Sequence, residues 1–142
     1  MTEGTFRKVA LVTGGARGIG RAIALNLSGD HDVAITYRKT VPDDVLGHLF
    51  AIRADFTDPH SHAAVIEAVM DRFGRLDLLV NNAGAIAASP AHEFDADAYR
   101  AQLDVNVLAP HGLLAAALPH LRAGAAIINI SSVNGKQPFK GC

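Results

Sequence analysis

The sequence predicts an α/β fold, in which a doubly wound parallel sheet is covered by helices on both faces. Short runs rich in β-branched residues alternate along the chain with longer, alanine-rich stretches of helical periodicity. The short runs are apolar throughout, as expected of strands that are buried on both faces. A cluster of glycines directly follows the first run, where the chain must turn from a strand into a helix.

The predicted strands cover residues 9–13, 33–37, 49–54, 76–80 and 125–130. The first predicted helix begins at Ile19, repeats its apolar residues at helical spacing, and ends near residues 28–29. The connection at 38–50 contains Pro42 and Gly47, so it has room for little more than one helical turn and is an abbreviated crossover.

Two more helices are predicted in the second half of the chain. One begins at residues 58–59, where a proline can open a helix, and ends at Gly74. The other extends from Asp95 to about Leu121, and Pro110 within it predicts a kink.

The size and composition of the chain favour one soluble, globular domain that covers residues 1–142. A folded chain of 142 residues buries roughly 68–70% of the surface that it exposes when unfolded. The formal net charge is −1, so no basic field would hold nucleic acid or an anionic membrane. Apolar residues make up 49% of the chain, yet no apolar run reaches the ~20 residues of a membrane span. A single cysteine, Cys142, and an amino terminus unlike a signal peptide favour a reducing cytoplasm.

The glycine cluster is the strongest local signal in the sequence. Gly14, Gly18 and Gly20 would allow a tight turn, a close approach of backbone to ligand, and close packing of a helix on a strand. The helix that follows would offer free N–H groups and a positive dipole end to a pyrophosphate. The Gly-x-x-x-x-Gly-Lys pattern of nucleoside-triphosphatase loops is absent. An ordinary glycine-rich turn is the alternative, which the position between a strand and a helix disfavours.

Four motifs follow one another along the chain: Thr-Gly-x-x-x-Gly-Ile-Gly at 13–20, Asn-Asn-Ala-Gly at 81–84, Asn106, and Asn-Ile-Ser-Ser at 129–132. In this order they resemble the short-chain dehydrogenases/reductases of the ordinary type, over essentially the whole chain. The resemblance implies a Rossmann-like sheet of about five strands in the order 3-2-1-4-5, without the C-terminal part of the family fold. It also implies a domain that binds NAD or NADP and moves a hydride to or from a carbonyl or alcohol carbon.

The end of the second predicted strand bears on the choice of cofactor. Enzymes that bind NAD place an acidic residue there to accept hydrogen bonds from the ribose hydroxyls, whereas this chain has Arg38 followed by Lys39. A guanidinium at this position would pair with a 2′-phosphate, which Arg17 could reach from the other side. We therefore expect NADP rather than NAD, the alternative being that these charges merely solvate a loop.

Other residues are assigned to the cofactor through the motifs that they match. Asp55 matches the family's aspartate at the adenine ring, with Phe56 beside it, and the small residues at 81–84 would let a dinucleotide come close. The turn at 81–84 could equally be an Asx-type turn without a ligand. The residues expected to bind the cofactor are Gly14, Arg17, Gly18, Ile19, Gly20, Arg38, Asp55, Phe56, Asn82, Ala83 and Gly84.

Two residues match the catalytic apparatus that the resemblance implies. Ser132, rather than its neighbour Ser131, matches the serine that holds the substrate oxygen, although a serine pair after a strand also serves as a cap. Asn106 matches the residue that anchors a proton-relay water. Pro110 lacks an N–H, so in an α-helix it would leave the Asn106 carbonyl without its usual partner and available to that water.

The catalytic Tyr-x-x-x-Lys of the family is absent from these 142 residues. Tyr37 and Tyr99 are followed at the fourth place by Val41 and Leu103, and the family's tyrosine would fall three residues after Cys142. Loss of a positioned general acid typically costs 10²–10⁴-fold in rate. We therefore expect a truncated, inactive NADP-linked reductase that acts on a small carbonyl or alcohol compound in its full-length form. A non-catalytic dinucleotide-binding or regulatory module is the alternative.

The histidines and the apolar surface of the chain bear on metal binding and on self-association. His60 and His62 lie close together, but no thiolate is near them, so we expect solvated histidines and no metal site. The last strand and the long helix would ordinarily be covered by the missing part of the family fold. We therefore expect an exposed apolar patch of several hundred Å² and, from it, a homo-oligomer or an aggregating chain.

Overall fold

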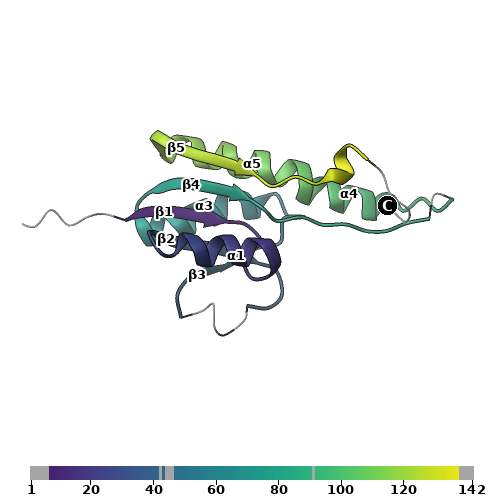
Figure 1. The fold of residues 1–142 in the computed structure, drawn as a ribbon. Helices are drawn as coiled ribbons and strands as arrows, with labels where there is room; N and C mark the ends of the chain where they lie inside the picture. Colours follow the sequence, from purple (N-terminus) through teal and green to yellow (C-terminus); the bar gives the residue numbers. More distant parts are fainter. Residues whose placement is uncertain (1–6, 42, 44–46, 91, 138–142) are drawn as a thin grey trace, which may run out of the picture.

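The computed structural model describes residues 7–41, 43, 47–90 and 92–137. Its centre is a parallel sheet of five strands in the order β3-β2-β1-β4-β5 (Figure 1). The strands are β1 (Lys8–Val12), β2 (His31–Tyr37), β3 (Phe50–Arg53), β4 (Leu76–Asn81) and β5 (Leu121–Asn129). The predicted strands and their order are confirmed, with ends that differ by at most four residues.

The helices also follow the prediction, with one irregularity. They are α1 (Gly18–Leu27), α3 (His60–Phe73), α4 (Ala96–Leu103), the π-helical segment η1 (Asp104–Leu108), α5 (Ala109–Ala117) and the 3₁₀ turns η2 (Leu118–His120) and η3 (Val133–Gly135). The short turn predicted in the connection at 38–50 falls partly outside the described residues. In the described part of the chain, no helix is long and apolar enough to cross a membrane.

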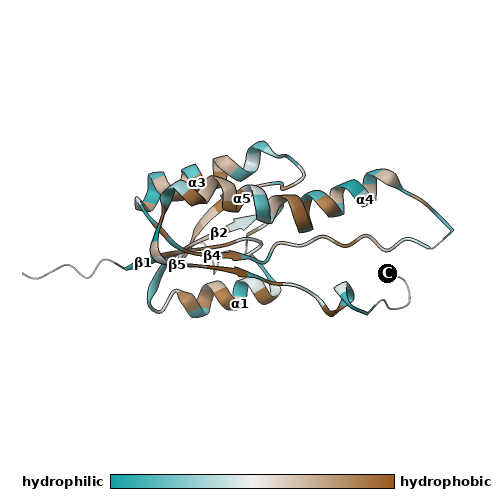
Figure 2. Ribbon diagram, turned by 90° about the horizontal axis from the view of Figure 1, so that it is seen from above, coloured by the Kyte–Doolittle hydropathy of each residue, from teal (hydrophilic) through white to brown (hydrophobic). Residues whose placement is uncertain are grey.

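Three layers result from this arrangement, with α1 on one face of the sheet and α3 and α5 together on the other (Figure 2). Side chains of a strand point alternately to the two faces, and β1 shows both. Its Val9 and Leu11 pack on the side of α3 and α5, whereas Ala10 and Val12 pack on the side of α1. All four are buried, which is why this strand is apolar throughout its interior.

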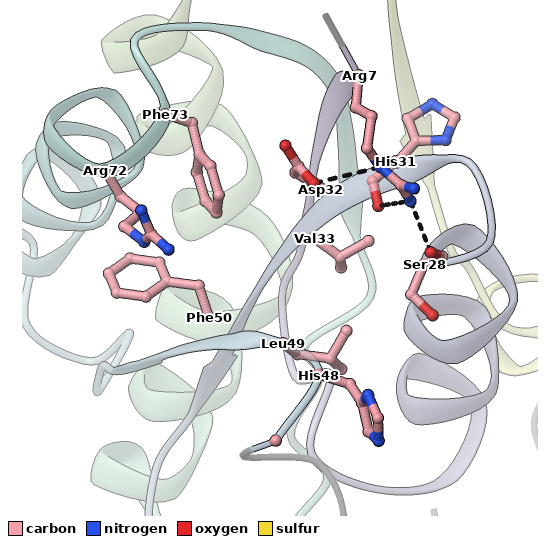
Figure 3. A pocket seen from close by; sticks show the side chains of 11 residues that line it. Arg7, Ser28, His31, Asp32, Val33, His48, Leu49, Phe50, Arg72 and Phe73 are labelled. Atoms are coloured by element: carbon pink, nitrogen blue, oxygen red, sulfur yellow. Dashed lines mark hydrogen bonds and ion pairs between the residues drawn. The ribbon is translucent and has the colours of Figure 1, made fainter.

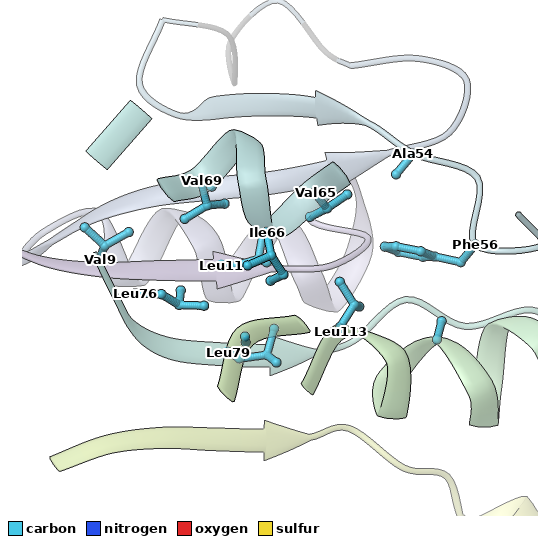
Figure 4. Close-up of a cluster of buried hydrophobic side chains, with 13 residues drawn as sticks. Val9, Leu11, Ala54, Phe56, Val65, Ile66, Val69, Leu76, Leu79 and Leu113 are labelled. Carbon is cyan, nitrogen blue, oxygen red and sulfur yellow. The ribbon is translucent and has the colours of Figure 1, made fainter. Parts of the chain in front are cut away.

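The larger core lies between the sheet and the helices α3 and α5 (Figure 4). Helix α3 contributes Val65, Ile66 and Val69, which the helical spacing places on one face. Each such fully buried side chain stabilises the fold by about 1.5–3 kcal/mol relative to an exposed one. His62 belongs to the same face and is only 9% exposed, so the expectation of a solvated histidine is wrong at this position.

Local signals at the helix ends explain where α3 and α4 start and stop. The Asp95 carboxylate accepts hydrogen bonds from the N–H groups of Asp97 and Ala98, both at 3.0 Å, and so caps α4. Gly74 ends α3 with a φ of 71°, a left-handed conformation that glycine adopts at little cost. The predicted start at Asp95 and end at Gly74 are both confirmed.

The long helical stretch after Asp95 is interrupted by π-helical geometry where the sequence predicted continuous α-helix with a kink. The N–H of Ala109 donates to the carbonyl of Asp104, an i→i+5 bond that widens the helix ahead of Pro110. This bond engages the carbonyl of Asp104 and not that of Asn106. A free Asn106 carbonyl therefore stays a prediction.

Strand β5 forms one edge of the sheet and is poorly covered. Ile127, Ile128 and Ile130 are 38%, 45% and 40% exposed although they follow or belong to a strand of the sheet. Figure 2 shows brown, apolar residues along β5, whereas α4 is of mixed colour. Exposed apolar side chains lie where the sequence predicted them, while the association of chains through them stays a prediction.

Candidate functional site

The carboxyl ends of the parallel strands bring three of the motifs to one edge of the sheet. The glycine loop follows β1, the segment 81–85 follows β4, and residues 130–132 follow β5. Strands β1 and β4 are direct neighbours at the centre of the sheet, where the order of connections reverses. Open parallel sheets bind ligands at this edge and at this reversal point.

Thr13 joins the glycine loop to the segment that follows β4. Its hydroxyl oxygen accepts the N–H groups of Asn82 at 3.0 Å and of Ala83 at 2.9 Å, and Thr13 is 1% exposed. The side-chain Nδ2 of Asn82 donates in return to the carbonyl oxygens of Thr13 at 3.0 Å and Gly14 at 3.3 Å. The side-chain amide therefore bridges the ends of the neighbouring strands and ties the glycine loop to β4.

Two of the three glycines meet close neighbours, and the third does not. A Cβ on Gly14, whose φ is 64°, would lie 3.0 Å from the Cα of Ala83, and one on Gly20 would collide with the Gly14 carbonyl and the Asn82 side chain. Gly18 has a φ of 55° and nothing within 4 Å of a Cβ. Gly14 and Gly20 allow the tight turn and the close packing that we expected, whereas Gly18 lies beside open space.

The sequence analysis missed two further residues that hold the loop. A Cβ on Gly15 would lie 2.5 Å from the Cγ2 of Ile35, so this glycine lets the loop pass close to β2. Thr36 accepts the N–H of Gly14 at 3.0 Å on its hydroxyl and the N–H of Gly15 at 3.1 Å on its carbonyl. A polar residue directly after the apolar run 33–35 of the second strand was the available signal for Thr36.

The amino end of α1 is open toward the same edge. Gly18 is the first residue of the helix, the Arg17 side chain makes no capping bond, and the first turn carries no acidic residue. Ile19, in that first turn, is 66% exposed. The first N–H groups of a helix have no partner within it and attract anions, so this end can hold a phosphate.

The cationic residues proposed for the 2′-phosphate are free to approach a ligand. Arg17, Arg38 and Lys39 are all exposed, and the Arg38 carbonyl accepts the Nε–H of Arg53 at 3.3 Å, which ties the end of β2 to β3. Arg17 belongs to the loop between β1 and α1, and Arg38 and Lys39 directly follow β2. The local charge is therefore positive where a phosphate would lie.

The residues after β3 have structural partners of their own. The Asp55 carboxylate accepts the backbone N–H of Thr57 at 3.0 Å and its hydroxyl at 2.8 Å, and these two bonds lower the pKa of Asp55 below its ordinary value. Phe56 is 6% exposed, and its ring contributes to the core. Asp55 stays charged and solvent-facing, whereas Phe56 can offer a ligand little more than its backbone.

Asn81 and Asn106 fix the segment that follows β4. The Nδ2 of Asn81 donates to Oδ1 of Asn129 at 2.8 Å, which joins β4 to β5 beyond their backbone ladder. The side chain of Asn106 accepts the N–H of Ala85 at 2.8 Å and donates to the Ala85 carbonyl at 2.7 Å. The amide of Asn106 thus holds Ala85, beside Gly84, with one donor and one acceptor.

Ser131 and Ser132 lie exposed just after β5. The Ser132 hydroxyl oxygen accepts the N–H of Asn134 at 3.3 Å, so this serine caps the short turn η3. Its own O–H remains able to donate, because a hydroxyl can accept and donate at the same time. The capping alternative and the substrate-holding role are therefore compatible.

A pocket of the described residues lies away from these motifs, at the amino edge of the sheet (Figure 3). Its volume is about 360 Å³, and it is lined by the starts of β2 and β3 and the end of α3. Arg7 spans it, donating to the carbonyls of Ser28 at 2.7 Å and His31 at 2.8 Å. No residue predicted for the cofactor or for catalysis lines this pocket, so it does not belong to the candidate site.

The chain matches a known family over nearly its whole length. A family model described as short chain dehydrogenase matches residues 8–142. An uncharacterised oxidoreductase of Methylorubrum extorquens is 40% identical over 136 residues, which cover 89% of this chain and 55% of the relative. The 3-oxoacyl-(acyl-carrier-protein) reductase of Staphylococcus aureus is 36% identical over 140 residues, which cover 90% and 57%. The chain thus spans little more than half the length of these relatives.

The fold resembles those of solved structures. A short chain dehydrogenase from Burkholderia cenocepacia in complex with NADP has 40% sequence identity and a TM-score of 0.85, over 94% of this chain and 59% of that one. A blue fluorescent protein from a metagenomic library, in complex with NADPH, has 35% identity and a TM-score of 0.87 over the same shares. The expected family and fold are confirmed.

Proposed function

The chain belongs to the short-chain dehydrogenase family of oxidoreductases, and from this premise we propose that residues 1–142 form the NADP-binding domain of a carbonyl or alcohol oxidoreductase. One observation carries the proposal. The Thr13–Asn82 contact holds the glycine loop so that Gly18 and the amino end of α1 face open space at the carboxyl edge of the sheet. The two relatives whose structures contain NADPH and NADP support the choice of cofactor.

The residues at this edge fit a dinucleotide. Gly18 leaves room where any side chain would stand between the backbone and a pyrophosphate, and Ile19 and Gly20 continue the row of helix N–H groups. Gly14, Asn82, Ala83 and Gly84 would form the wall on the side of β4. NADPH supplies a hydride when it is bound. We assign Asp55, with the backbone of Phe56, to the adenine end.

The preference for NADPH over NADH follows from charge. Arg38 and Arg17 are exposed on the two loops that flank the amino end of α1, where a 2′-phosphate would meet them from both sides. The described part of the β2 end carries no acidic side chain before Asp43 that could bind ribose hydroxyls instead. We expect a charge-assisted contact of this kind to favour NADPH by at least about tenfold.

The chemistry of this chain is confined to holding the substrate oxygen. In the reduction of a carbonyl, its carbon gains a hydride and its oxygen gains a proton, and the Ser132 hydroxyl would donate a hydrogen bond to that oxygen. The Asn106 carbonyl would hold a water of the proton relay. Neither tyrosine of the chain is followed by a lysine at the fourth place, so the 142-residue chain by itself lacks the expected proton donor. We therefore propose cofactor binding without turnover for this chain alone.

A non-catalytic dinucleotide-binding or regulatory module is the second candidate, because the edge formed by the glycine loop and the end of β4 would bind a dinucleotide without any catalytic residue. The two candidates differ in one outcome. Supplying a segment that carries Tyr-x-x-x-Lys, taken from a relative of full length, should restore carbonyl reduction if the chain is part of a reductase. Saturable binding with no turnover under those conditions would favour the module.

Isothermal titration calorimetry of the 142-residue chain with NADPH and with NADH tests the proposal directly. We expect saturable binding of NADPH that is at least about tenfold tighter than that of NADH. The substitution Arg38→Gln should remove this preference, while Arg100→Gln, which breaks an exposed ion pair on α4, should leave it unchanged. Absence of heat with both dinucleotides would overturn the proposal.

The proposal extends to partners and to location. The side chains of Ile127, Ile128 and Leu103 are exposed. They support a homo-oligomer, because exposed apolar surface favours the association of chains. Sedimentation velocity should then show species larger than the monomer, and a clean monomer with a cooperative melt would contradict it. A small carbonyl or alcohol compound is the proposed substrate class. One cysteine in 142 residues fits the reducing cytoplasm that we propose as its location.

A further inference from the structure

Arg53 is a further arginine at the carboxyl edge of the sheet, where the cofactor is proposed to bind. It is the last residue of β3, in register with Tyr37 at the end of β2. Side chains of a strand alternate between the two faces of a sheet, so Arg53 projects to the same side as Ala51. Ala51 and Tyr37 both pack in the core on the side of α1. Arg53 therefore extends from the face that α1 covers, and Arg17 directly precedes that helix.

One hydrogen bond fixes the direction of the Arg53 side chain. Its Nε–H donates to the carbonyl oxygen of Arg38 at 3.3 Å, so the guanidinium lies beside the residue that directly follows β2. A guanidinium has five N–H donors, and this bond uses one of them. The N–H groups on the two terminal nitrogens have no partner among the described residues, and the side chain is exposed. These groups remain available to a ligand that accepts hydrogen bonds at the end of β2.

Positive charge gathers at this point without matching carboxylates. Arg38 and Lys39 follow β2, Arg53 ends β3, and Arg17 precedes α1. None of these four residues forms an ion pair with a described residue. The pKa of Asp55 is lowered chiefly by its own hydrogen bonds and only in a smaller part by the charge of Arg38. Like charges repel one another, so a dianionic phosphate at this edge would relieve an unfavourable interaction.

We propose that Arg53 is a further determinant of the preference for NADPH, an inference that rests on the proposed cofactor site. Its Nε–H stays on the Arg38 carbonyl, while its terminal N–H groups donate to the 2′-phosphate. Arg53 thus adds a charge at the phosphate and holds Arg38 at the end of β2. NADH carries a hydroxyl in place of this phosphate, so its binding gains little from Arg53. A purely structural role would need only the bond to Arg38 and would affect both dinucleotides alike.

Isothermal titration calorimetry of the 142-residue chain with NADPH and with NADH tests this role. Arg53→Met removes the charge and every side-chain donor, so it should weaken NADPH binding at least about tenfold and NADH binding by less than about twofold. Arg53→Lys keeps a positive charge and should recover most of the NADPH affinity. Arg72→Met, in the pocket at the amino edge of the sheet (Figure 3), is the matched control and should bind both dinucleotides as the parent does.

The outcomes distinguish this inference from the proposed function. If the parent prefers NADPH and Arg53→Met keeps that preference, the role of Arg53 is overturned and the proposed function stands. Equal weakening of both dinucleotides in Arg53→Met, or an Arg53→Lys variant that binds no better than Arg53→Met, would reduce Arg53 to a support of the loop and overturn the inference. Absence of binding to the parent would overturn both. Thermal unfolding monitored by circular dichroism should show the same transition for all variants, because these side chains are exposed.

Discussion

Thr13 and Asn82 hold each other by reciprocal hydrogen bonds: the Asn82 N–H donates to the Thr13 hydroxyl oxygen at 3.0 Å, and Asn82 Nδ2 donates to the Thr13 carbonyl at 3.0 Å. The two residues are 69 positions apart in the sequence, at the ends of adjacent strands. Backbone and side chain of each residue take part. The glycine loop is therefore positioned by β4 as well as by β1, before any ligand contributes.

Thr13→Val removes the centre of this contact while keeping the shape of the side chain. The N–H groups of Asn82 and Ala83 would then lose their acceptor at a position where Thr13 is 1% exposed. Unpaired buried donors cost about 1–3 kcal/mol each, so we expect the free energy of unfolding to fall by about 2 kcal/mol or more. Urea denaturation measures it, and Thr40→Val, on an exposed loop, should change it by less than ~0.5 kcal/mol. Equal effects of both substitutions would contradict this role of Thr13.

Gly18→Ala and Gly20→Ala should separate ligand binding from folding. A Cβ on Gly20 would collide with backbone and side-chain atoms, so Gly20→Ala should destabilise the fold by about 2 kcal/mol or more. Gly18 has free space but a φ of 55°, which should cost about 1 kcal/mol in Gly18→Ala. The added methyl of Gly18→Ala would stand in the proposed path of the pyrophosphate. Calorimetry should then show weaker NADPH binding for Gly18→Ala although its unfolding curve is near that of the parent, and unchanged affinity would argue against the proposed site.

The sequence was sufficient for features that depend on local pattern. Apolar runs marked the strands, Asp95 and Gly74 marked helix ends, and the spacing of the glycines indicated their geometry, because each depends on neighbours within a few residues. The strand order came with the family resemblance rather than from any single run. In these cases local preference and tertiary structure agree.

Features that depend on the docking of distant elements could not be predicted. The burial of His62 follows from its contact with Gly112, 50 positions later, which exists only once α3 and α5 have packed on the sheet. The π-helical segment at Asp104–Leu108 lies within an unbroken helical pattern, and the two bonds between Asn106 and Ala85 hold it from outside. No pattern within one helix encodes either partner.

The packing of His62 against Gly112 predicts a reversal of an ordinary effect. Gly→Ala within a helix usually stabilises it by roughly 0.5–1 kcal/mol, but Gly112→Ala would force the His62 ring to move. We expect Gly112→Ala to destabilise the chain by about 1–3 kcal/mol. In His62→Ala the space for the new methyl is already present, so the double variant should lose less stability than the sum of the single variants. Additive losses in urea denaturation would show that the two residues do not interact.

Asp77 predicts how stability responds to acid. Its carboxylate accepts two hydrogen bonds from the Arg75 guanidinium, at 2.7 and 2.8 Å, and one from the backbone N–H of Val9 at 2.8 Å. Chiefly through Arg75, these contacts lower the pKa of Asp77 in the folded chain below the value of about 3.9 in an unfolded one. A lowered folded pKa contributes stability that is fully present above pH ~4 and is lost as the pH falls through that folded pKa.

Asp77→Asn should therefore cost about 1–2 kcal/mol at pH 7 and flatten the decline in unfolding free energy below pH ~4. Urea denaturation between neutral and acidic pH measures both effects, with the exposed Asp97→Asn as control; an acid decline as steep in Asp77→Asn as in the parent would place the responsible carboxylate elsewhere.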